Sequence, residues 1–244
     1  MKKRTVARSK SQTGKLLVAG AVCLLLFSGI SDTLAINTYV RDLKGLAIPV
    51  QTFRVDQKVV ALTFDVRNDE DQVAQILLQL REEKAKATFF LTGEWIQRHR
   101  SLARAIVRDG HEVGRSLYSD RDASQLSLEE LREELWKTDQ AWADAQLPEE
   151  KLFRAPHGET SRQIAKEIRT RHEQLIAWSI DAAPVAEETT AAAWSALKAA
   201  LSPGEIIRLR ADEITAKGLT ELIGQIRDAG YQAHTISTLQ AEVL

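Results

Sequence analysis

The sequence has little of several residue types, and each shortage excludes a class of protein. It has a single cysteine, Cys23, with only 5 prolines and 12 glycines in 244 residues. One cysteine excludes a disulfide framework, and the low content of Gly and Pro excludes collagen-like and low-complexity chains. With 44% hydrophobic residues the chain can bury a core. Its length fits one ordinary domain with a short appendage.

The chain as a whole also lacks an excess of positive or negative charge, but its charges are unevenly distributed. There are 33 basic and 34 acidic side chains, and six of the bases lie in residues 1–15, which contain no acid. The remaining 27 bases and 34 acids give the rest of the chain a net charge of −7. A body of that charge has no general attraction for phosphate, so we expect no nucleic acid partner.

Only one long hydrophobic run is present, at Leu16–Ile30, directly after the basic residues. A helix of this length spans roughly 22 Å, less than a comfortable membrane crossing. The pattern is typical of a secretory signal cleaved after Ala35, and equally of an uncleaved anchor in residues 1–35. Both interpretations predict that the rest of the protein is secreted or held outside the cell membrane. Cys23 lies in this run, so the exported part offers no thiolate metal ligand.

Beyond this run, strand-like and helix-like segments alternate. Residues 36–57 are weakly patterned and predict a stalk, a linker or an edge segment, while residues 58–241 form the expected domain. The expected strands are residues 58–64, 87–92, 111–116, 151–154, 175–180, 205–210 and 233–236. The expected helices are residues 73–84, 102–110, 127–145, 161–171, 190–201 and 218–230. This alternation predicts an α/β fold with a parallel sheet or barrel covered by helices.

Polar residues stand at the ends of several expected strands. In parallel α/β folds the carboxyl ends of the strands meet at one edge, where functional sites are found. The residues at these ends are Asp65, Ser116, Arg154, Asp181 and Arg210. Their clustering would form a candidate site.

Six short stretches follow one another in a recognisable order: LTFD at 62–65, ATFFLTG at 87–93, GHEVG at 110–114, FRAPHGE at 153–159, WSID at 178–181 and AGY at 229–231. Together they resemble the polysaccharide deacetylase family, the carbohydrate esterases with the NodB homology domain. The resemblance covers roughly residues 58–241 and implies a distorted (β/α) barrel. It also implies metal-assisted removal of acetyl groups from N-acetyl sugars, with an Asp-His-His metal triad, an Asp base and a His acid.

The sequence departs from the family where this chemistry is carried. The family's metal-ligand positions fall on Val66, Ser116 and Asp120, of which only Asp120 keeps a carboxylate. The family's acid histidine falls on Arg210, which cannot act as a general acid or base because its guanidinium does not deprotonate. We therefore expect no cofactor, with a divalent metal such as zinc only under the alternative that a residual site persists.

At three other positions the sequence keeps the residue types that the family has in its catalytic site. Asp65 is at the position of the base, Arg154 at the one that orients the base, and Asp181 at the one that partners the acid. We hypothesise that Asp65 pairs with Arg154 and Asp181 with Arg210, so that ion pairs replace the catalytic site. His157 and Trp178 are expected to line the groove, and His111 to be a hydrogen-bonded residue near the core.

Three functions remain open at this point. The first is a degenerate, metal-free family member that binds peptidoglycan or a related cell-wall glycan, or serves as a scaffold. The second is an active or residual metal-dependent N-deacetylase. The third is a structural envelope protein that binds a protein partner through the outer face of helix 127–145. Trp136 and Trp142 lie on different sides of this helix, so one of them is expected to be exposed, where an aromatic ring could stack on a sugar.

Overall fold

The computed structural model describes residues 49–67, 70–182 and 191–243, which belong to one compact unit. The predicted signal or anchor, with Leu16–Ile30 and Cys23, lies outside the described residues. Within the part that is described, no helix combines the length and the apolar character needed to cross a bilayer.

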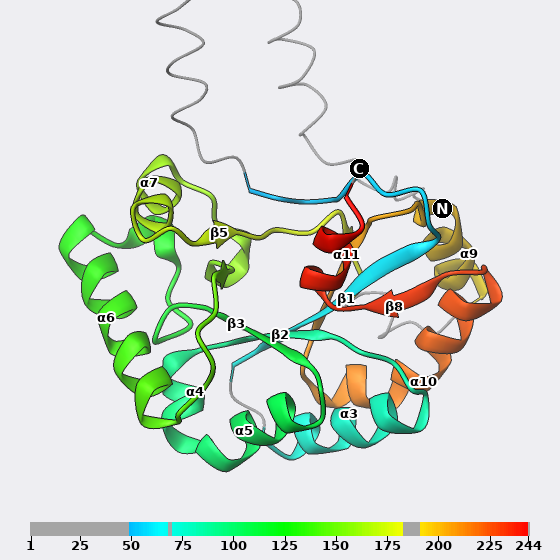
Figure 1. The fold of residues 1–244 in the computed structure, drawn as a ribbon, viewed down its shortest axis with the longest axis horizontal. Helices are drawn as coiled ribbons and strands as arrows, with labels where there is room; N and C mark the ends of the chain where they lie inside the picture. The colour runs from blue at the N-terminus through cyan, green and yellow to red at the C-terminus, as the bar shows by residue number, and fades with distance from the viewer. Residues whose placement is uncertain (1–48, 68–69, 183–190, 244) are drawn as a thin grey trace, which may run out of the picture. The chain divides into compact units, whose positions relative to one another are not determined.

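A curled parallel sheet forms the centre of the domain (Figure 1). Its order is β5-β4-β3-β2-β1-β7-β6, and β8 pairs with the beginning of β1. The strands are β1 (Val59–Val66), β2 (Thr88–Leu91), β3 (Glu112–Arg115), β4 (Leu152–Phe153), β5 (Gln174–Leu175), β6 (Ile180–Asp181), β7 (Ile206–Arg210) and β8 (Gln232–His234). The predicted α/β fold, a distorted barrel, is confirmed.

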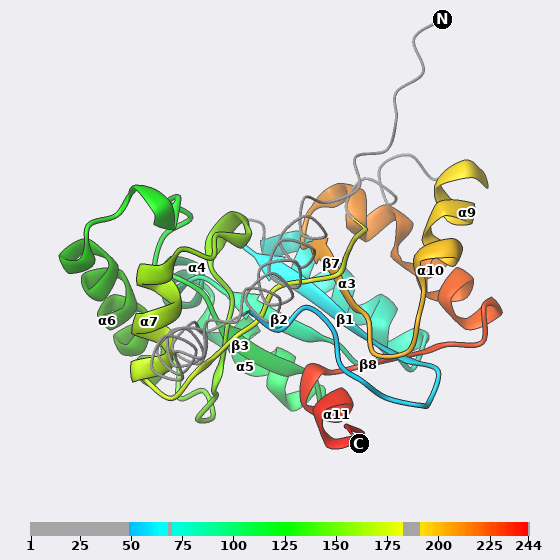
Figure 2. The same cartoon turned by 90° about the horizontal axis from the view of Figure 1, so that it is seen from above.

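Helices cover the outside of the sheet, with α3, α5 and α10 side by side along the central strands (Figures 1 and 2). They are α3 (Glu70–Glu82), α4 (Gly93–Arg98), α5 (Arg100–Arg108), α6 (Leu128–Asp144), α7 (Arg162–Thr170), α9 (Ala191–Ala200) and α10 (Glu213–Asp228). Helix α11 (Ile236–Ala241) instead packs Ile236 and Leu239 into the core inside the curl of the sheet. The capping box predicted at Ser127 and Glu130 is present at the start of α6. Helix α10 begins earlier than predicted because Asp212 accepts a hydrogen bond from the Thr215 backbone N–H at 2.9 Å.

Two hydrophobic cores follow from the alternation of side chains along β1. Leu62, Phe64 and Val66 belong to the large core between the sheet and the helices. Val59 and Ala61 belong to a second core, inside the curl of the sheet. Because residues two apart share a face, Thr63 and Asp65 also lie on the inner side, at the carboxyl end of the strand. The fold thus places Asp65 in the mouth of the barrel.

The single strand predicted at residues 175–180 is wrong. These residues instead run from the end of β5 to the start of β6, and the two strands lie at opposite ends of the strand order because the chain between them crosses the barrel. Val50 supports this crossing, since its N–H donates to the Leu175 carbonyl and its carbonyl accepts from the Ala177 N–H, both at 2.8 Å. The described part of the predicted linker, residues 49–57, is therefore an edge segment that packs against the sheet.

Candidate functional site

Asp65 is the centre of a buried charge cluster at the carboxyl end of β1. Its side chain is held by two arginines: Arg154 Nη1 donates to Oδ1 at 3.1 Å, and Arg208 Nε donates to Oδ2 at 2.8 Å. Burial alone would raise the pKa of Asp65, but the charges and hydrogen bonds of Arg154 and Arg208 outweigh it and hold that pKa below its usual value. Asp65 is therefore a carboxylate with both oxygens occupied.

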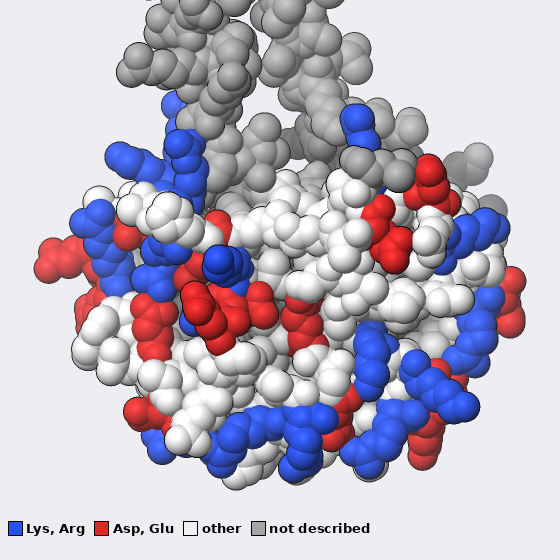
Figure 3. Space-filling view, viewed as in Figure 1, with Lys and Arg blue, Asp and Glu red and all other residues white. Residues whose placement is uncertain are grey.

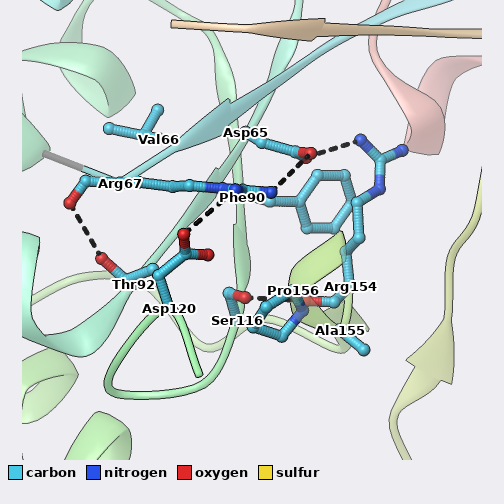
Figure 4. Close-up of a pocket in the computed structure, with 10 residues that line it drawn as sticks. All are labelled: Asp65, Val66, Arg67, Phe90, Thr92, Ser116, Asp120, Arg154, Ala155 and Pro156. Atoms are coloured by element: carbon cyan, nitrogen blue, oxygen red, sulfur yellow. Dashed lines mark hydrogen bonds and ion pairs between the residues drawn. The ribbon is translucent and has the colours of Figure 1, made fainter. Parts of the chain in front are cut away.

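Arg154 is held rigidly beneath this carboxylate, with only 1% of its surface exposed. Its Nη1 also donates to Thr63 Oγ1 at 2.9 Å, and its Nη2 donates to the Ala177 carbonyl at 3.0 Å. The guanidinium lies over the ring of Phe90, 4.1 Å from its centroid. The pairing of Asp65 with Arg154 that the sequence predicted is present in the structure (Figure 4).

The predicted pairing of Asp181 with Arg210 is wrong. Asp181 Oδ2 accepts from Arg208 Nη1 at 2.9 Å, while Arg210 Nε lies 3.3 Å from Asp212 Oδ2 at the exposed end of β7. The parallel register explains this, because it sets Asp181 opposite Arg208 and leaves Arg210 one pleat nearer the strand end. Sequence reasoning missed Arg208. The signal was its spacing from Arg210, because residues two apart in a strand lie on the same face, so Arg208 was as well placed to reach the site as Arg210.

The three residues that the motifs predict at the family's ligand positions have other roles here. Val66 is buried in the hydrophobic core beneath the helices. Ser116 Oγ donates to the Arg154 carbonyl at 2.8 Å. Asp120 Oδ2 accepts from Arg67 Nη1 at 3.0 Å, so its carboxylate is already paired with a guanidinium (Figure 4).

A divalent metal does not fit this set of side chains. Only one of the three positions offers a carboxylate, whereas a firm site needs about three protein ligands. The arginines Arg67, Arg154 and Arg208 place three positive charges around Asp65, which opposes a further cation. Across the described residues, no cluster of three or more His, Cys, Asp or Glu side chains is arranged to hold a metal ion.

A small recess remains beside the cluster, with a cavity volume of about 10 Å³, which is room for about one water molecule (Figure 4). Asp65, Arg67, Thr92, Ser116, Asp120 and Pro156 are among its lining residues. His157 lies beside Asp120, with its Nε2 3.1 Å from the Asp120 carbonyl oxygen. Trp178 is half-buried, with its ring centroid 4.8 Å from the Arg208 guanidinium carbon. The polar and aromatic groups predicted to line a groove thus lie around the same charges.

Three residues that the sequence analysis singled out lie away from this cluster. His111 is buried against Phe89 as predicted, but its Nδ1 has no hydrogen-bond partner, contrary to the prediction. Burial, with a contribution from the charge of Lys86, lowers the pKa of His111 to about 4. Trp142 is buried and donates to the Pro148 carbonyl at 2.8 Å, whereas Trp136 is 59% exposed on α6.

The fold and the position of Asp65 define an α/β barrel protein with its candidate site at the carboxyl ends of the strands. The family model for polysaccharide deacetylase matches residues 53–174, half of the chain. The chain therefore belongs to the polysaccharide deacetylase family, as its motifs predicted.

Several relatives place the chain within this family. The uncharacterized Bacillus subtilis protein YlxY is 27% identical over 194 residues, covering 80% of this chain and 61% of that protein. A peptidoglycan-N-acetylglucosamine deacetylase of Bacillus cereus is 32% identical over 127 residues, 51% of this chain and 58% of the enzyme. The chain thus matches about 60% of the length of these relatives.

Among solved structures, a pseudoenzyme of carbohydrate esterase family 4 from Bacillus anthracis is similar, with a TM-score of 0.73 and 25% identity. The match covers 81% of this chain and 70% of that one. The crystal structure of a mutant of this pseudoenzyme with restored enzymatic activity is equally similar, at 26% identity. The family therefore contains both deacetylases and a member without activity.

Proposed function

We propose that this protein is a catalytically inactive, metal-free member of the polysaccharide deacetylase family that binds N-acetylated cell-wall glycan. One observation carries the proposal: both oxygens of Asp65, at the position of the base, accept hydrogen bonds from buried arginines. A base must have a free oxygen directed at its water, and its proton affinity must suit the reaction. Asp65 meets neither requirement.

The other parts of the reaction are missing as well. A metal polarises the amide carbonyl in the family, and the residues at its positions do not fit one. The departing amine needs a proton donor, and Arg210 at the acid position cannot give up its proton at ordinary pH. With these groups absent, the ion-pair cluster of Asp65, Arg154, Arg208 and Asp181 stabilises the mouth of the barrel and leaves no route for deacetylation.

Glycan binding is the activity that we assign to the surface around Trp178. Trp178 presents a partly exposed ring beside Arg208, and an aromatic face with adjacent donors suits a sugar ring. The Bacillus cereus relative is named for its action on peptidoglycan N-acetylglucosamine, so peptidoglycan is the glycan to test first.

Sedimentation of the full-length protein with insoluble peptidoglycan tests this proposal. We expect the wild type to sediment with the polymer and Trp178→Ala to lose at least about tenfold in affinity, as expected for loss of a stacking contact at the centre of a site. Trp136→Ala is the matched control because it removes an exposed tryptophan from a different surface. Wild-type protein that stays in the supernatant, or equal binding by both variants, would contradict glycan binding in the groove.

A second candidate function rests on the exposure of Trp136. This ring lies on α6, whose charges pair across to α7, as in Arg132 with Glu167 at 3.2 Å. Acidic and basic side chains are mixed over these two helices (Figure 3). A large exposed aromatic side chain framed by both charges suits an envelope protein partner. Crosslinking in cells favours this function if Trp136→Ala loses a partner that Trp178→Ala keeps.

We also propose that residues 36–244 act outside the cytoplasm, secreted or held at the cell membrane. The support is the run Leu16–Ile30 behind six basic residues. Protease added to intact protoplasts should digest the domain if this is correct, and should leave it intact if the domain is cytoplasmic.

A further inference from the structure

Arg67 lies between two carboxylates of the candidate site. It follows the end of β1, and its Nη1 is 3.0 Å from Asp120 Oδ2 while its Nη2 is 4.0 Å from Asp65 Oδ2 (Figure 4). Asp120 stands at a family ligand position and Asp65 at the position of the base. One guanidinium therefore bridges the two acidic side chains that remain at those positions.

The two carboxylates need a positive charge at this place. They line the same recess, and carboxylates that share a site repel each other unless a cation or a proton intervenes. Asp65 has Arg154 and Arg208 on its other side, whereas Asp120 contacts Arg67 and, at 3.6 Å, His157 Nε2. The Arg67 side chain is only 20% exposed, so water screens its charge incompletely.

We propose that Arg67 replaces the family's divalent cation. Its guanidinium is permanently charged and takes over the compensation of Asp120 and Asp65 that a bound metal would otherwise provide. It also occupies the Asp120 oxygen nearest to it and repels other cations. This inference rests on the proposed metal-free state. It adds that the metal is excluded by the charge of Arg67 as well as by the loss of ligand side chains.

The test measures the binding of Mn²⁺ to the full-length protein. Binding is detected as a loss of the electron paramagnetic resonance signal of the free ion. Carboxylate and hydroxyl oxygens suit this hard ion. We expect Arg67→Ala to bind Mn²⁺ at least about tenfold more tightly than the wild type, because removal of the charge leaves Asp120 without its guanidinium partner and the recess with one positive charge fewer. Arg67→Lys keeps the charge and should exclude the ion as the wild type does.

Two further variants make the result specific. Arg67→Ala combined with Asp120→Asn should lose the gained binding, and Arg121→Ala, which removes an exposed arginine paired with Glu130, should gain none. If Arg67→Ala does not fold alone, recovery of folding on addition of Mn²⁺ supports the proposal, and failure to recover contradicts it.

Equal Mn²⁺ binding by the wild type and Arg67→Ala would overturn this inference, and so would binding by Arg67→Lys as tight as by Arg67→Ala. Either outcome leaves the glycan-binding proposal intact, because that is measured by sedimentation of the wild type. Deacetylation by the wild type would instead overturn the proposed function.

Discussion

Arg208 Nε donates to Asp65 Oδ2 at 2.8 Å, within a cluster that also holds Asp181 through Arg208 Nη1. This guanidinium joins the ends of β1, β6 and β7, at the place where the motifs predict the catalytic residues. Under the proposed function, these charged side chains form a fixed ion-pair network and take no part in proton transfer.

Removal of Arg208 should be costly for stability. Arg208→Leu leaves Asp65 with one close partner in place of two, and loss of one member of a buried ion pair costs about 3–5 kcal/mol. Because Arg154 remains, we expect the free energy of unfolding, measured with urea, to fall by about 3 kcal/mol. The control is Arg210→Leu on the same strand, whose exposed pair with Asp212 should contribute less than ~1 kcal/mol. Equal losses would show that the buried network does not stabilise the domain.

The lowered pKa of Asp65 should appear as acid sensitivity. Between the lower folded pKa and the usual value of 3.8, the unfolded state binds a proton that the folded state does not. The stabilisation from Asp65 is therefore present above pH 4 and is lost as the pH falls through the folded pKa. Urea unfolding at several pH values should show a shallower loss of stability below pH 4 in Asp65→Asn than in the wild type. Identical slopes would mean that Asp65 is not held as a carboxylate.

His111 should give a second pH effect in a separate range. Its folded pKa of about 4 lies below its usual 6.5, so the unfolded state binds the proton first as the pH falls. Stability should fall between pH 6.5 and pH 4, by at most about 3 kcal/mol for a shift of this size. His111→Phe should remove this dependence, and a titration of the His111 ring near pH 6.5 by NMR would disprove the account.

Gly158 is predicted to set the position of Trp178. Its φ of +74° lies in the left-handed region, and a Cβ there would come within 2.3 Å of the Trp178 ring. Gly158→Ala should therefore lower stability by about 1–3 kcal/mol and change the fluorescence of Trp178. Gly224→Ala is the control, since Gly224 lies in α10 with no atom within 4 Å of its added Cβ. That change should stabilise the protein by up to ~1 kcal/mol, and equal effects at the two glycines would contradict the prediction.

The sequence predicted those parts of the fold that depend on local pattern. The period of β1 and the capping box of α6 are local signals, and both elements are present within two residues of the predicted bounds. The division of residues 175–180 into β5 and β6 was not predictable in this way. It depends on the closure of the barrel by Val50, which is distant in the sequence.

The candidate site shows the same limit. Asp65 and Arg154 were predicted to pair from their family positions, and they do. The partner of Asp181 depends on the register of β6 against β7, which sequence alone does not give. Arg67 and Arg208 were missed because the family comparison considers the catalytic positions, and these arginines stand beside them.

Release of acetate tests the central claim most directly. Full-length protein is incubated with peptidoglycan and with N-acetylglucosamine polymers, with zinc, with cobalt and without added metal. The Bacillus cereus relative serves as the positive control. We predict no acetate above the protein-free blank under any condition, from protein shown to be folded. Acetate release that is lost in Asp65→Asn would contradict the account, because it would show that this buried, doubly paired carboxylate still acts as a base.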